Sequence, residues 1–196
     1  MASSKNSESR VRGMIKSFLT DRLIDCKRGL ITLPKGSDIL FSVVVFLIYI
    51  SVALSIGFCS GFFNIKVLKA DSWVMIILPI SLFFVPSLFE EAFFRGFLLP
   101  HKSRATSTGI LLLYSVFSIF VFIVWHPINA MTINHPAFAI FTNLVFLCLA
   151  ALMGIACTIT YLKTGSLWVP VVIHWLTVLA WVFFLNGRNC VLDIAQ

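Results

Sequence analysis

Two adjacent glutamates, Glu90 and Glu91, lie in one of the most apolar stretches of the chain, and Arg95 follows one helical turn later. A charged side chain at the centre of a bilayer costs about 2.5 to 3.5 kcal/mol or more, so such residues indicate a functional site. Glu91 and Arg95 are four residues apart, share a helix face and are expected to form an ion pair. Glu90, about 100° around the helix, is then left as an uncompensated carboxylate that suits a general base or acid.

Two histidines extend this set. His126 follows Trp125 at the end of one apolar run, and His174 lies inside another. Two histidines and a carboxylate pair on three separate segments favour one catalytic site over isolated packing histidines. A structural network that holds helices together is the alternative. The other histidines, His101 and His135, fall in predicted loops and are expected to be ordinary loop residues.

The sequence gives weaker support for a metal site and for catalysis by a serine or cysteine nucleophile. A glutamate and two histidines could bind zinc, but there is no HExxH and no two histidines share a helix face. No GxSxG is present, and no cysteine neighbours a histidine in the sequence. We therefore expect a site without metal or cofactor. The odd number of cysteines and the lack of a CxxC predict reduced packing residues: Cys26, Cys59, Cys148, Cys157 and Cys190.

Composition shows what kind of scaffold must position these groups. The 196 residues are 59% hydrophobic and 12% charged, with a mean hydropathy of +0.99, whereas soluble domains have about 25% charged residues. Continuous apolar runs predict an all-α polytopic transmembrane helical bundle rather than a barrel of alternating strands. Pro79 and Pro86 should bend the second span. We expect about five spans, at residues 39–58, 73–99, 110–125, 138–160 and 168–185.

The net charge of +7 is concentrated at one end of the chain. Eight of the fifteen Lys and Arg residues lie in residues 1–38, which argues against nucleic-acid binding and indicates a cytoplasmic flank facing anionic lipid. Apolar residues at helical spacing from Ser9 to about Cys26 predict a basic amphipathic interfacial helix, and a solvated charged tail is the alternative. Residues 1–9 are expected to be disordered. The first long apolar run begins only near Ile39, which argues against a cleavable signal peptide.

The positive-inside rule then predicts the orientation. With a cytoplasmic N-terminus, the inner segments hold eleven Lys and Arg, while the outer segments hold Lys66, Lys69 and Arg188. We therefore expect two parts, a basic cytoplasmic segment at 1–38 and a transmembrane domain at 39–196, with the C-terminus outside.

Three sequence blocks together resemble a known family. They are EExxxR from Glu90 to Arg95, FxxxH from Phe122 to His126, and SLWxPxxxH from Ser166 to His174. In this order, across about residues 79–181, they resemble the CAAX protease and bacteriocin-processing (CPBP, or Abi) family of glutamic intramembrane proteases. The resemblance implies an intramembrane endopeptidase in a bacterial plasma membrane, acting on a membrane-associated protein or peptide.

The resemblance also implies roles for the residues. Glu90 would be the general base and, with His126, would activate a water molecule for attack on a peptide carbonyl. Glu91 and Arg95 would orient and support it, and His174 would stabilise the oxyanion. Preorganised hydrogen-bond donors of this kind usually make the largest single contribution to the rate enhancement of an enzyme.

One position departs from the family pattern. The family usually has Asn or Asp four residues after the last histidine, where this chain has Val178. Thr177 and Asn129 are the candidate replacement donors. If neither serves, the chain is a weakly active enzyme or a non-catalytic relative. The alternative function is a non-catalytic membrane scaffold or an immunity-type protein of the same family. A proton-coupled transporter is a third class, which five spans without an internal repeat argue against.

Depth in the bilayer presents a geometric problem. At 1.5 Å per residue from the inner loops, Glu90 lies about 18 Å along its helix, His174 about 12 Å and His126 about 30 Å. A common site therefore requires helix tilt or a bend at Pro86.

Overall fold

The computed structural model describes residues 2–187, with side chains from Arg10 onward. Arg188 and Cys190, which entered the charge and cysteine arguments, lie outside the described residues. The described chain is all-α, as predicted, apart from one isolated bridge between Lys66 and Leu185. Its helices are α1 (Ala2–Ile31), α2 (Gly36–Cys59), α3 (Ser72–Leu82), η1 (Phe83–Leu88), α4 (Phe89–Glu91), η2 (Ala92–Phe97), α5 (Thr108–Thr132), η3 (His135–Ala137), α6 (Phe138–Phe141), α7 (Leu144–Thr164) and α8 (Trp168–Phe184).

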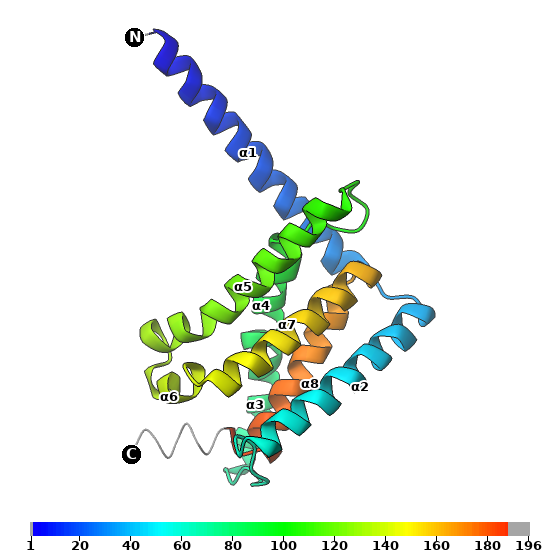
Figure 1. Ribbon diagram of the computed structural model, residues 1–196, viewed down its shortest axis with the longest axis vertical. Coiled ribbons are helices and arrows are strands. Elements are labelled where there is room, and N and C mark those ends of the chain that lie inside the picture. The colour runs from blue at the N-terminus through cyan, green and yellow to red at the C-terminus, as the bar shows by residue number, and fades with distance from the viewer. Residues whose placement is uncertain (1, 188–196) are drawn as a thin grey trace.

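Four segments of the described chain are long and apolar enough to cross a membrane: α2, α5, α7 and the continuous stretch Ser72–Phe97. The apolar helix α8 has 17 residues and is about 26 Å long, close to the minimum for a span. The protein is therefore an integral membrane protein with a polytopic helical bundle (Figure 1). The sequence prediction of this fold class is confirmed.

The second membrane segment is interrupted at Pro86, one of the two prolines expected to bend it, whereas Pro79 lies inside the continuous helix α3. Val85 has non-helical φ and ψ of −129° and 111°, directly before Pro86. Proline lacks an amide hydrogen and clashes with the preceding turn, so the regular helical hydrogen bonds are interrupted here. Ser87 Oγ donates to the Leu82 carbonyl at 2.8 Å and satisfies one acceptor at the bend. The bend separates α3 from the turns that contain Glu90 and Glu91.

The helices at the third and fourth predicted spans begin and end at other residues than expected. The loop expected after Trp125 is helical, because α5 continues through Pro127 to Thr132. Pro127 removes one backbone donor and crowds the preceding turn, yet α5 continues for five residues beyond it. The fourth span does not begin as one helix at residue 138, because α6 ends at Phe141. Asn143 then starts α7, where its side chain accepts from the amide of Val145 at 2.8 Å.

The N-terminal helix α1 is longer than predicted, and the expected disorder of residues 1–9 is wrong from Ala2 onward. Figure 1 shows α1 extending from one end of the bundle and crossing the direction of α5. The last turns of α1 pack against η2, where Cys26 Sγ donates to the Ala92 carbonyl at 3.6 Å. The position of α1 at a lipid interface, its binding of anionic lipid and the domain boundary at residue 38 stay predictions.

Helix α7 lies at the centre of the bundle and packs against α2, α5 and α8. Small buried residues line it, including Ala150, Gly154, Ala156 and Cys157. They allow the neighbouring helices to approach closely, since packed helices are separated by 8–10 Å depending on the side chains between them. The residues singled out by the sequence lie on the segments around this helix.

Candidate active site

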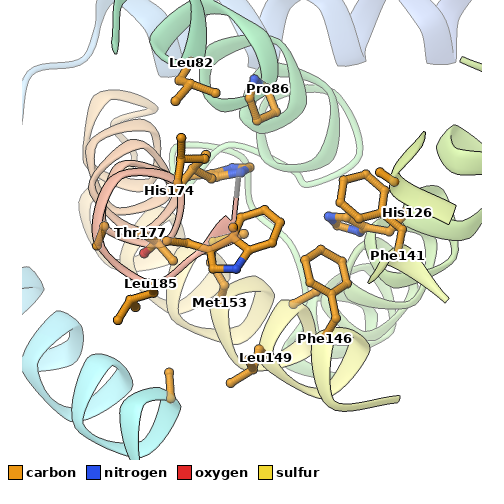
Figure 2. Close-up of a pocket in the computed structure, with 18 of the residues that line it drawn as sticks. Leu82, Pro86, His126, Phe141, Phe146, Leu149, Met153, His174, Thr177 and Leu185 are labelled. Atoms are coloured by element: carbon orange, nitrogen blue, oxygen red, sulfur yellow. The ribbon is translucent and has the colours of Figure 1, made fainter. Parts of the chain in front are cut away.

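A cavity of about 330 Å³ lies between α2, η1, α5, α7 and α8. Figure 2 shows His126 and His174 on opposite sides of it, with Phe146 and Met153 along one edge and Pro86 along another. Most of its lining is apolar. The polar side chains that reach it are Tyr49, Glu90, His126, Asn129, Asn134, His174 and Thr177. A concave, mostly apolar site with a few convergent polar groups is the usual form of a ligand or active site.

Glu90 is the carboxylate of this cavity. Its Oε1 accepts a hydrogen bond from the Trp125 indole nitrogen at 3.1 Å. Its Oε2 is buried and has no hydrogen-bond partner in the described structure. Glu91 Oε2 is likewise buried without a partner, but of the two glutamates only Glu90 lines the cavity. One oxygen of Glu90 is thus held in place by Trp125, while the other is left to interact with a reactant.

The predicted ion pair between Glu91 and Arg95 is present. Arg95 Nη1 lies 3.0 Å from Glu91 Oε1, and both side chains are fully buried. Arg95 Nη2 also donates to the Gly154 carbonyl at 3.1 Å, and its guanidinium carbon lies 4.6 Å from the centre of the Phe122 ring. The arginine therefore ties η2 to α5 and α7 at the level of the cavity. Glu91 lies behind the cavity wall.

His174 lines the same cavity as Glu90, and its hydrogen-bond partner is Glu91. His174 Nδ1 donates to Glu91 Oε1 at 2.9 Å, so that oxygen accepts from both His174 and Arg95. The reason is helix geometry: Glu91 points toward Arg95 and α8, whereas Glu90 is rotated into the cavity. With Nδ1 engaged, Nε2 is the His174 nitrogen that remains for a reactant.

His126 reaches the same cavity, which removes the predicted problem of depth. Its Nδ1 donates to the Phe122 carbonyl at 2.9 Å, so Nε2 of the neutral ring is an acceptor. The Phe122 ring packs edge-on against both histidines, with ring centres 4.9 Å from His126 and 6.0 Å from His174. Phe141 and Phe146 cover the other sides of His126. The imidazole is thereby oriented by one hydrogen bond and three aromatic contacts.

The two candidate replacement donors for Val178 differ in the structure. Thr177, Val178 and Asn129 all line the cavity. Thr177 Oγ1 donates its single hydrogen to the Ile173 carbonyl at 2.8 Å, so that donor is already used. The Asn129 side-chain amide has no hydrogen-bond partner within the described part of the chain. Asn129 is therefore the better placed of the two to donate to a reactant.

Trp125 and His101 form hydrogen bonds that the sequence did not predict. Trp125 holds Glu90, and the only sequence signal for it was its position beside His126. His101, expected to be an ordinary loop residue, is buried, and its Nε2 donates to the Gly165 carbonyl at 3.1 Å. Burial lowers the pKa of His101. His101 thus serves a structural role far from the cavity.

The described residues contain no group of three or more His, Cys, Asp or Glu side chains arranged to hold a metal ion. Glu91 is paired with Arg95, so among the described cavity residues Glu90 is the carboxylate without an ion-pair partner. The arrangement is suited to proton transfer by Glu90 and to hydrogen-bond donation from the facing side chains.

The fold and the cavity define a class: integral membrane proteins with a carboxylate and two histidines enclosed in a helical bundle. The family model described as type II CAAX prenyl endopeptidase Rce1-like matches residues 70–180, which include all three sequence blocks. The match spans more than half of the chain, and the chain belongs to this family of intramembrane proteases. The resemblance to the CPBP family is thereby confirmed. No match was found among curated proteins or among solved structures.

Proposed function

We propose that this protein is a glutamic-type intramembrane endopeptidase that hydrolyses a peptide bond of a membrane-associated protein or peptide. The observation that carries the proposal is the unpartnered, buried Oε2 of Glu90 in a cavity that also contains His126 and His174. A carboxylate oxygen without a partner is costly in a protein interior, and a role in proton transfer explains its retention.

In the proposed reaction, Glu90 Oε2 accepts a proton from a water molecule that His126 Nε2 orients. The resulting hydroxide attacks the peptide carbonyl carbon, and the carbonyl oxygen becomes an oxyanion. When the carbon–nitrogen bond breaks, Glu90 returns the proton to the leaving amine. Glu90 thus acts first as a general base and then as a general acid, which restores the enzyme at the end of each cycle.

Two side chains are proposed to stabilise the oxyanion. His174 donates through Nε2 as an imidazolium, with Glu91 as its counter-ion at Nδ1. Asn129 supplies the second donor in place of the polar residue that Val178 replaces. Glu91 and Arg95 do not contact the reactant in this scheme, and their role is to position His174 and the Glu90 helix. The reaction as written needs no metal.

Glu90→Gln tests the proposal. Glutamine retains an oxygen acceptor for Trp125 but cannot act as a base, so expression and folding should be normal while cleavage falls by about 10² to 10⁴-fold. Comparing membrane proteomes of cells with the wild type and with Glu90→Gln should reveal an uncleaved precursor. Asp71→Asn is the matched control, since Asp71 is exposed and outside the cavity.

Two results would count against this scheme. Cleavage of the native substrate that survives Glu90→Gln means that Glu90 is not the base. Inhibition by a chelator that zinc reverses contradicts the metal-free reaction. The valine at position 178 favours one other function, a non-catalytic membrane scaffold, and the complete lack of Glu90-dependent cleavage would support it.

A further inference from the structure

The basic residues of the bundle gather at one end, where several segments meet. Arg104, in the loop after η2, donates through Nε to Asp25 of α1 at 2.8 Å. The neighbouring Lys102 donates through Nζ to the carbonyl of Thr164, the last residue of α7. Lys163 lies over the ring of Phe41 in the first turns of α2. The end of α1, the start of α2, the loop before α5 and the end of α7 thus form one face.

This face and the helix that extends from it contain most of the described positive charge. Lys and Arg residues of the face are Arg22, Lys27, Arg28, Lys35, Lys102, Arg104 and Lys163, and Arg10, Arg12 and Lys16 lie further along α1, which extends from the same end. At the opposite end, the described loops at 60–71, 133–143 and 185–187 contain Lys66 and Lys69. Loops rich in Lys and Arg remain on the cytoplasmic side of a membrane. The face formed with α1 is therefore the cytoplasmic one.

The cavity is built from the other ends of the same helices. Helix α2 contributes only residues from Tyr49 onward, and α7 only residues up to Met153. Helix α5 contributes from Trp125 to its end, and α8 from His174 to its end. Asn134 and Gly187, in the loops beyond α5 and α8, complete the lining. The cavity therefore extends from Glu90 toward the end of the bundle that lacks the basic cluster.

We infer that the cavity opens to the non-cytoplasmic side of the membrane, and that the substrate is a polypeptide segment lying on that side or in that half of the bilayer. The part that concerns a substrate rests on the proposed function. The lining between Glu90 and the mouth is apolar or uncharged, including Phe62, Asn134 and Trp181, which suits an apolar, uncharged segment around the bond to be cut. A prenylated carboxyl terminus anchored to the cytoplasmic leaflet cannot reach this mouth.

Thiol labelling tests which face the cavity opens to, without requiring cleavage. The starting protein has Cys26, Cys59, Cys148 and Cys190 replaced by serine, and retains Cys157, which is fully buried. Asn134→Cys then places one thiol at the mouth, and Ala105→Cys places one in the exposed loop of the basic face. A membrane-impermeant maleimide should label Asn134→Cys in intact cells, and Ala105→Cys only in inside-out vesicles. The reverse pattern would overturn the inference.

A third variant, Asn129→Cys, probes the interior of the cavity. A small charged methanethiosulfonate should modify it from the same side as Asn134→Cys. Modification only from the side of Ala105→Cys, or from neither side, would overturn the inference.

The substrate part is tested by the positions of Glu90-dependent cleavages in the membrane proteome. They should map to non-cytoplasmic segments or to the adjoining half of a span, and cytoplasmic positions would refute this part. A proteome without any Glu90-dependent cleavage contradicts the proposed function instead, and the labelling pattern then decides the face by itself.

Discussion

Arg95→Met should destabilise the protein strongly. Arg95 is fully buried and bonded to Glu91 at 3.0 Å and to the Gly154 carbonyl at 3.1 Å. Methionine fills much of the same volume but leaves Glu91 as a buried carboxylate without its cation. Breaking a buried pair by removing one partner costs about 3–5 kcal/mol, so we expect a loss of stability in that range.

The double variant Glu91→Gln/Arg95→Met separates the charge effect from lost packing. It removes both charges, so it should be less destabilised than the two single changes combined, by a coupling energy of about 0.5–3 kcal/mol. Glu90→Gln is the matched control, because the same chemical change one residue earlier leaves the Arg95 pair intact. Its stability should stay within about 1 kcal/mol of the wild type, since Trp125 keeps an acceptor.

Unfolding in mixed detergent micelles measures these differences. Far-UV circular dichroism follows helix loss. In the background with Cys26, Cys59, Cys148 and Cys190 replaced by serine, the reaction of a thiol dye with Cys157, which has no exposed surface, reports opening of the core. The reasoning is refuted if Arg95→Met lowers the free energy of unfolding by less than about 1 kcal/mol, or if the two single changes are additive.

Three further changes test the positioning of the site. Trp125→Phe removes the one hydrogen bond to Glu90, so cleavage should fall while the free energy of unfolding changes by about 1 kcal/mol; equal cleavage would show that Glu90 needs no such support. Asn129→Ala should lower kcat by about 10² to 10³-fold if its amide is an oxyanion donor, and a change confined to KM would exclude that role. Gly96→Ala places a Cβ 2.8 Å from Cys26 Sγ and 2.9 Å from Leu167 Cδ1 and should cost about 1–3 kcal/mol by overpacking, partly recovered by adding Cys26→Ala; a cost below about 0.5 kcal/mol would mean that η2 is not packed this closely.

Much of the fold follows from local pattern. Runs of about 20 apolar residues must form helices in a bilayer, because only a helix satisfies every backbone group within one segment. The Glu91–Arg95 pair was predictable for the same reason, since a four-residue spacing places both side chains on one helix face. Helix ends were less predictable: the extension of α5 beyond Pro127 and the new start at Asn143 depend on how small local preferences compete with packing.

By itself, the sequence determined the class of fold, the ionisable residues within the apolar spans and the pairing of Glu91 with Arg95. Only the tertiary structure decided which groups face each other across helices. His174 bonds to Glu91 over 83 residues of chain, and Trp125 bonds to Glu90 over 35. These contacts depend on helix crossing and on the bend at Val85, which together set the distance and rotation between helices. Spacing along one helix contains no information about either quantity.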